Sequence, residues 1–231
     1  MSDAAGQVDV AANLAAIRRR FDVAAAAAGR APDSIVLIAV AKGQPSERIA
    51  AALAAGQRVF GENYVQEAAA RWPGLRERWP GVELHLVGAL QSNKVREAVA
   101  LFDVIESVDR PRLAEALAGA AARAGRCPRL LLQVNSGREP QKAGVAPEGV
   151  GDLLALCRDR LRLPVVGLMA IPPEDEDVGP HTRRLAELAA QHGLAAVSCG
   201  MSADFEQAIR HGATHVRVGS AIFGGRRPRP R

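Results

Sequence analysis

The sequence predicts a single (β/α)8 barrel of the TIM type, and three observations lead to this α/β fold class. The chain has 231 residues, a length that one such barrel can fill. Eight short apolar runs, with turn residues at one or both ends, follow one another along the sequence. Segments with helical periodicity separate these runs, whereas a doubly wound sheet would more often stop at about five or six strands.

The helical segments between the runs carry start signals. Ser46 and Ser92 each stand ahead of a helical stretch, and Pro147 opens another that extends to Arg160. A further helix over 8–28 precedes the first strand, and we expect it to cover the barrel where an eighth helix would sit. The strands are expected at 35–41, 58–60, 83–88, 103–108, 129–134, 164–170, 194–199 and 213–218.

The domain organisation follows from these limits. The barrel domain spans 8–225, with an N-terminal tail at 1–7 and a basic C-terminal tail at 226–231. The basic tail supplies much of the formal net charge of +5, so the barrel itself is close to neutral. Pro228 and Pro230 prevent a basic helix in the tail, and aromatic residues make up only 3% of the chain. We therefore expect neither a nucleic acid nor a membrane as a partner.

The cysteines and the N-terminus indicate the compartment. Cys127, Cys157 and Cys199 are widely spaced and form no CxxC motif, which favours reduced thiols over disulfides or a metal site. Asp3 and Asp9 lie near the start of the chain, where no basic stretch leads into a long apolar run. We expect a cytoplasmic protein without a signal peptide, a membrane span or a bound metal.

Polar residues gather where the predicted strands end. Barrels of this type place their sites at the carboxyl ends of the strands, so these residues are the candidates for a ligand site. The opposite ends of the strands show no comparable cluster. The candidate cofactor-binding residues are Lys42, Asn63, Ser202, Arg217, Gly219 and Ser220. Met169 is added because it stands at a strand end, although a methionine at such a place is more often part of a core.

The lysines sharpen this prediction. The sequence contains only three, Lys42, Lys94 and Lys142, and all of them follow predicted strands. An amine, unlike a guanidinium, can lose its proton and attack a carbonyl. Lys42 directly follows the apolar run IVLIAVA, so we favour a covalent or anion-binding role for it over that of a plain rim lysine. For Lys94 and Lys142, chance placement or a role as a point charge explains the positions equally well.

Two glycine-containing turns predict an anion site. The segment VRVGSAIFG at 216–224 indicates a strand, a glycine turn and one short helical turn, which exposes consecutive backbone N–H groups. The segment SCGMSADFEQAI at 198–209 predicts a second glycine turn between a strand and a helix, with Ser202 at or near the N-cap of that helix. With Arg217 between them, the two turns predict the phosphate site that barrels often build after strands seven and eight.

Other polar residues favour structural roles. His85 lies within the third predicted strand, and we interpret it as a packed, hydrogen-bonded histidine rather than a catalytic one. The carboxylates of the run at 174–177 are expected in a solvated loop and not at a metal site.

The order of the motifs resembles that of one known family, the pyridoxal phosphate homeostasis proteins. These proteins are in turn similar to the barrel domain of bacterial alanine racemases, the N-terminal domain of those enzymes. The resemblance covers about 13–224. The motifs that carry it are AVAKGQP, FGENYVQE, HLVGALQSNK, VNSGREPQKAG, GLMAIPP, SCGMSADFEQAI and VRVGSAIFG.

The resemblance implies a cofactor and a role for each matching residue. Lys42 would carry pyridoxal 5'-phosphate (PLP) as an internal aldimine, a Schiff base. Arg217 would lie beside the pyridine nitrogen, with Ser202, Gly219 and Ser220 around the phosphate. The implied function is intracellular PLP homeostasis, in which the protein holds PLP and controls its supply to apoenzymes. PLP-dependent apoenzymes are therefore candidate partners, and a monomer or weak dimer is expected.

The sequence also favours a carrier over an enzyme. A racemase of this fold needs a second acid/base, a tyrosine brought in by a C-terminal β-domain, whereas the only tyrosine here is Tyr64, in the FGENY motif. An arginine at the ring nitrogen would keep that nitrogen unprotonated, which weakens the ring as an electron sink. Two alternatives remain open: a weak amino-acid racemase that uses Lys42 as its base, and an aldolase in which Lys42 or Lys142 forms the Schiff base.

Overall fold

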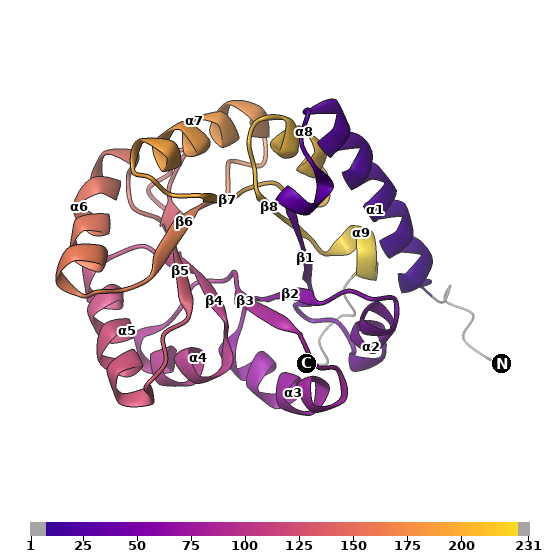
Figure 1. The fold of residues 1–231 in the computed structure, drawn as a ribbon, viewed down its shortest axis with the longest axis horizontal. Helices are drawn as coiled ribbons and strands as arrows, with labels where there is room; N and C mark the ends of the chain where they lie inside the picture. The colour runs from indigo at the N-terminus through magenta and orange to yellow at the C-terminus, as the bar shows by residue number, and fades with distance from the viewer. Residues whose placement is uncertain (1–7, 226–231) are drawn as a thin grey trace.

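The structure, a computed structural model, describes residues 8–225, and its eight parallel strands form a closed barrel (Figure 1). Neighbouring strands pair in chain order, and the last strand pairs with the first, so the predicted fold class is confirmed. The two predicted tails, 1–7 and 226–231, lie outside the described residues. The strands are β1 (Val36–Val40), β2 (Val59–Glu62), β3 (Glu83–Leu86), β4 (Val104–Val108), β5 (Arg129–Val134), β6 (Val165–Ala170), β7 (Ala196–Ser198) and β8 (His215–Val218).

Helices surround the strands on the outside of the barrel (Figure 1). Ser46 and Ser92 are each predicted just ahead of a helix. Ser46 is instead the first residue of its helix, and Ser92 opens a 3-10 turn that leads into the next one. The run from Pro147 to Arg160 consists of a 3-10 turn, an α-helix and a π-helical stretch. The helices are α1 (Val10–Ala27), α2 (Ser46–Ala54), α3 (Val65–Arg78), α4 (Val95–Leu101), α5 (Pro111–Ala124), α6 (Val150–Ala155), α7 (Val178–Gln191), α8 (Phe205–Arg210) and α9 (Ser220–Phe223).

Helix α1 completes the outer ring. It packs against α8, α9 and α2, and it lies between α8 and α2 in the ring (Figure 1). Its buried face includes Leu14, Ile17 and Phe21, which recur at helical spacing. The expectation that this helix stands where an eighth helix would sit is confirmed.

The strands separate two cores. Side chains alternate between the faces of a strand, so Ile105 of β4 belongs to the large core under the helices, while Val104 packs inside the barrel. The interior apolar cluster is small and consists of Val104, Leu131, Met169 and Ala196. Much of the rest of the barrel interior is polar, whereas the interior of such barrels is usually filled by branched apolar side chains.

Within residues 8–225, no helix has the length and apolar character needed to cross a membrane.

Candidate functional site

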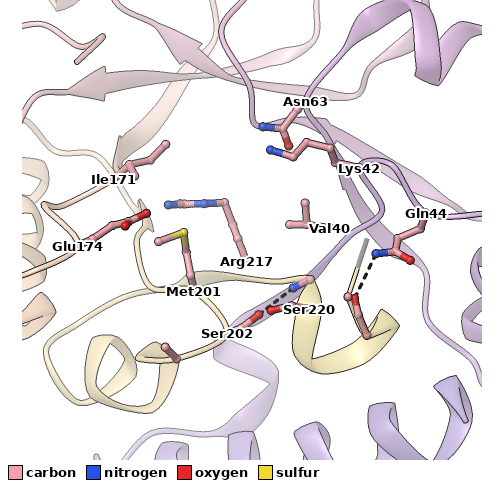
Figure 2. A pocket seen from close by; sticks show the side chains of 14 residues that line it. Val40, Lys42, Gln44, Asn63, Ile171, Glu174, Met201, Ser202, Arg217 and Ser220 are labelled. Atoms are coloured by element: carbon pink, nitrogen blue, oxygen red, sulfur yellow. Dashed lines mark hydrogen bonds between the residues drawn. The ribbon is translucent and has the colours of Figure 1, made fainter. Parts of the chain in front are cut away.

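A cavity of about 600 Å3 opens at the carboxyl ends of the strands (Figure 2). Six of the seven residues predicted from the sequence line it, and they come from the ends of β1, β2 and β8 and from the loop after β7. The six are Lys42, Asn63, Ser202, Arg217, Gly219 and Ser220. The other lining residues are Val40, Gln44, Ile171, Glu174, Met201, Ala203, Gly224 and Gly225.

Lys42 reaches the cavity because β1 ends just before it. Ala41 is fully buried and its backbone N–H donates to the Gly61 carbonyl at 2.8 Å, which fixes the start of the lysine side chain in the barrel wall. The half-buried Lys42 side chain extends beside Asn63, across the cavity from Arg217 (Figure 2). It is the only lysine among the described residues that line the cavity.

The other two lysines lie outside the cavity and are ion-paired. Lys94 Nζ lies 2.9 Å from Glu97, and Lys142 Nζ lies 2.5 Å from Glu139. Both pairs are partly exposed, so they resemble the surface ion pairs that add little stability. Their position distinguishes Lys42 from the other two amines.

Gly88 sets the position of Asn63. An added Cβ at Gly88 would lie 2.3 Å from the Asn63 carbonyl oxygen and 2.7 Å from its Cα. Only glycine therefore lets the loop after β3 approach the end of β2 this closely, because backbone atoms cannot move aside as a flexible side chain can. The two loops together hold Asn63 at the cavity wall.

The turns after β7 and β8 meet at one corner of the cavity. The Gly219 backbone N–H donates to Ser202 Oγ at 3.1 Å, which leaves the Ser202 hydroxyl proton available for an acceptor in the cavity. Within residues 8–225, the backbone N–H groups of Ser220 and Ala221 make no hydrogen bond to the protein. The corner thus offers several donors and suits an anion such as a phosphate.

Ser202 lies near the N-cap of a helix, as predicted, but is not the N-cap residue itself. Helix α8 begins at Phe205, and Asp204 is its N-cap residue. The Asp204 carboxylate accepts a hydrogen bond from the Met201 backbone N–H at 2.5 Å, and this contact closes the intervening turn. Gly200, with a φ of +93°, adopts a conformation that favours glycine and turns the chain out of β7. Ser202 is therefore held in the turn, close enough to bond Gly219.

Arg217 is fixed at the base of the cavity. It is 5% exposed, and its Nη1 donates to Ser198 Oγ at 2.6 Å while its Nη2 donates to the Ala170 carbonyl at 2.8 Å. The carboxylate of Glu106 lies 4.0 Å from Nη1 and supplies a negative charge. An arginine offers five N–H groups, so donors remain for a ligand after these contacts.

The sequence did not indicate Ser198 or Glu106 as part of the site. Glu106 is fully buried on β4, and it accepts hydrogen bonds from Ser198 Oγ at 2.6 Å and from His85 Nδ1 at 2.6 Å. Burial alone would raise the pKa of Glu106, but the hydrogen bond from His85 and the charges of His85 and Arg217 lower it to about 2. The interpretation of His85 as a packed, hydrogen-bonded residue is confirmed.

The structure does not place Met169 on the cavity wall. Its side chain is fully buried in the interior apolar cluster, below the cavity. Ile171, two residues further on, lines the cavity instead and is 38% exposed. Side chains two residues apart share a face of a strand, so Met169 also points into the barrel. It lies in the layer of side chains below the cavity and does not reach the cavity wall.

The prediction of a solvated loop at 174–177 is confirmed, because all four carboxylates are exposed and lie outside the helices and strands. Glu174 lines the cavity, and Glu176 lies 2.9 Å from the buried His181 ring. Asp177 is the N-cap of α7 and accepts a hydrogen bond from the Gly179 backbone N–H at 2.7 Å. Within residues 8–225, no group of three or more His, Cys, Asp or Glu side chains is arranged to hold a metal ion.

The geometry defines a class of site. A lysine amine, an anion-binding corner and a fixed guanidinium line one barrel mouth from different sides (Figure 2). Such a cavity suits a small molecule that carries both a carbonyl and a phosphate. The chain therefore has the features of a lysine-based, phosphate-recognising barrel.

The chain belongs to the family described as "Alanine racemase, N-terminal domain", which it matches over residues 12–227. It is also 41% identical over 234 aligned residues to the pyridoxal phosphate homeostasis protein of Escherichia coli strain K12, with 94% of this chain and 97% of the relative covered. The relative of the same name in Aquifex aeolicus is 36% identical, with 93% and 97% covered. These relatives place the chain within the pyridoxal phosphate homeostasis proteins.

Solved structures agree with this assignment. The structure of PipY from Synechococcus elongatus PCC7942 with PLP bound is 39% identical to this chain and superposes with a TM-score of 0.79, covering 93% of this chain and 100% of PipY. The alanine racemase of Clostridium difficile 630 is only 15% identical, with a TM-score of 0.68. It is covered over 58% of its own length, against 96% of this chain, and this likeness shows the barrel fold alone.

Proposed function

We propose that this protein binds PLP in the mouth of the barrel, holds it on Lys42 and controls its supply to other proteins. The observation that carries the proposal is that Lys42, Arg217 and the corner formed by Ser202, Gly219 and Ser220 line the same cavity. Relatives of about 40% identity are named for PLP homeostasis, and a solved relative contains PLP.

The residues present fit the cofactor. The cavity of about 600 Å3 falls within the usual range for a small-molecule site, about 300–1,000 Å3. Backbone N–H groups of Ser220 and Ala221 and the Ser202 hydroxyl supply donors for a phosphate, and Arg217 supplies a donor for the pyridine nitrogen. When bound, PLP supplies an aldehyde that condenses with an amine, releasing water, and the product absorbs visible light.

The protein's own groups act mainly by holding and orienting the ligand. Arg217 donates hydrogen bonds and keeps its proton, so it does not protonate the ring nitrogen. Glu174 is the single carboxylate among the described lining residues, and Tyr64 is not among them. We therefore propose a carrier that catalyses no reaction of its own, since the second acid/base that a racemase of this fold uses has no counterpart in the described cavity.

Two further points belong to the same proposal. The carrier would work in the cytoplasm and deliver PLP to PLP-dependent apoenzymes. The three described cysteines are free thiols, which suits a reducing compartment. The anion-binding corner opens to the surface with the rest of the cavity, so the cofactor could leave without unfolding of the barrel.

The test is an absorption spectrum of the purified protein with PLP, followed by borohydride reduction and peptide mapping. We expect a visible band that reduction abolishes and a reduced adduct on the peptide that contains Lys42. Lys42→Ala should remove the band, whereas the matched variants Lys94→Ala and Lys142→Ala should keep it, because those lysines lie outside the cavity. A yellow Lys42→Ala variant with the adduct on Lys94 or Lys142 would contradict the proposal.

A further inference from the structure

A continuous chain of buried polar groups connects the floor of the barrel to Arg217. Glu83 stands at the start of β3, on the floor, and its Oε1 lies 2.7 Å from His85 Nε2. His85 Nδ1 lies 2.6 Å from Glu106, Glu106 lies 2.6 Å from Ser198 Oγ, and Ser198 Oγ lies 2.6 Å from Arg217 Nη1. These groups come from four strands, and the three between Glu83 and Arg217 are at most 1% exposed.

The positions of the hydrogens in this chain follow from the donor inventory. Arg217 can only donate, so Ser198 Oγ accepts a hydrogen bond from it. The single hydroxyl proton of Ser198 is therefore donated to Glu106. Glu106, as a carboxylate, then accepts from both Ser198 and His85. His85 faces a carboxylate at each ring nitrogen, so it donates from both and carries a positive charge.

Charges of alternating sign therefore extend through the barrel, from Glu83 through His85 and Glu106 to Arg217. The pKa values agree in direction. Burial alone would lower the pKa of His85, but the hydrogen bonds to Glu106 and Glu83 and their charges raise it to about 9. Two other charged or titratable groups face the lower end: Arg129 Nη2 lies 2.7 Å from Glu83, and the His215 ring centroid lies 6.1 Å from that of His85.

This arrangement has a consequence for the ligand site. The donor and acceptor roles in the chain are fixed, and Arg217 Nη1 and Nη2 each donate to a buried oxygen, so the guanidinium is held in one orientation at the cavity wall. Without the negative charge of Glu106, Arg217 would be a buried cation with one neutral anchor at Ser198 and one at the Ala170 carbonyl. A buried charge that loses its partner is strongly destabilised, so the observed orientation of Arg217 would no longer be the favoured one.

We propose that Glu106 and the protonated His85 are positioning residues that hold Arg217 in place for the pyridine ring of the cofactor. The inference rests on the proposed function and adds to it a support that lies in the barrel interior, outside the cavity. His85 on β3 and Glu106 on β4 would then affect the binding of a ligand that neither residue contacts.

The first test uses the cofactor-free protein, so it does not depend on loading. The ring nitrogen shifts of His85 are followed by NMR across a pH series, with His85→Gln to assign the signal. We expect both ring nitrogens to stay protonated at pH 8 in the wild type and in Ser198→Ala. Glu106→Gln should lower the midpoint of this titration by about one pH unit or more, because it removes a carboxylate partner. A neutral wild-type His85 at pH 7 would overturn the inference.

The second test measures PLP binding by titration and the wavelength of the visible band. Glu106→Gln and Ser198→Ala should each weaken binding about tenfold and displace the band, because the guanidinium beside the ring is no longer fixed. The matched control is Glu62→Gln, since Glu62 is also 0% exposed but faces α3, where it accepts from Trp72 Nε1 at 2.9 Å. The control should keep the wild-type affinity and band.

The outcomes separate the two proposals. A wild-type protein that gives no visible band with PLP contradicts the proposed function itself. A wild-type band with unchanged affinity and wavelength in Glu106→Gln and Ser198→Ala overturns the positioning role alone. Equal losses in Glu106→Gln and Glu62→Gln also overturn it, since the effect would then be general destabilisation by a buried amide.

Discussion

The free energy of unfolding should fall as the pH rises above neutrality, and His85 should be the cause. Its pKa is about 9 in the folded protein, against an ordinary value of 6.5. Above pH 6.5 the unfolded chain has lost this proton while the folded chain retains it, so each increase in pH favours unfolding. The stabilisation is fully present below pH 6.5 and is lost as the pH passes through about 9.

The size of the effect follows from the two pKa values. Their difference corresponds to about 3 kcal/mol over the whole range, and to about 2 kcal/mol between pH 7 and 8.5. The narrower interval is preferable because the thiols of Cys157 and Cys199 have raised pKa values through burial, and unfolded cysteines begin to ionise near the upper limit. A loss of this size is a large part of the stability of an ordinary domain, which is about 5–15 kcal/mol.

The assay is urea unfolding under reducing conditions at pH 7, 7.5, 8 and 8.5, followed by the fluorescence of the buried Trp72. The control variant is His85→Gln, which has no imidazole to titrate and should show a much smaller dependence on pH in this interval. A flat wild-type profile, or an equal slope in His85→Gln, would refute the assignment of a positive charge to His85.

The remaining predictions concern His215 and the cavity. Burial lowers the pKa of His215 to about 4, so stability should also fall as the pH drops from 6.5 toward 4, and His215→Asn should reduce this acid loss in the same unfolding assay. Gly88→Ala should lower the free energy of unfolding by about 1–3 kcal/mol and weaken PLP binding, because its Cβ would meet Asn63. Its control is Gly74→Ala on α3, where the added Cβ meets nothing within 4 Å and helix propensity favours alanine by about 1 kcal/mol. Pyridoxal without its phosphate should bind much more weakly than PLP in a titration, and equal affinities would contradict the phosphate corner. Steady-state assays should find no substantial turnover of alanine or serine, and a rate of about one per second would favour the racemase alternative.

The sequence predicted the barrel because its strands are buried on both faces. Such strands form short apolar runs, and the ends of each run lie within two residues of the ends of the observed strand. The same property made the cavity residues visible, since polar side chains directly after an apolar run stand out. Lys42 after β1 and Arg217 near the end of β8 are examples of this signal.

The interior polar chain could not be predicted in the same way. Glu106 lies in the middle of the run DVIESV, where residues on both faces are buried, so no alternation of polar and apolar residues shows which face points into the barrel. Its partners Ser198 and His85 come from other strands, and only the closed barrel brings them together. The contacts of Glu176 with His181 and of Asp177 with the Gly179 backbone could not be predicted either, because these partners come close only after the loop folds.

The order of the strands in the chain has a consequence for synthesis on the ribosome. Lys42 follows the first strand, while Ser202 and Arg217 belong to the end of the barrel, and β8 must pair with β1 before the cavity has two sides. At about 5–20 residues per second, translation exposes the lysine on the order of ten seconds before the anion-binding corner. The nascent chain therefore presents an amine without the groups that would retain a phosphorylated aldehyde. Cofactor loading is expected to begin only after the last strand has left the ribosome, so a truncated chain would leave PLP for other proteins.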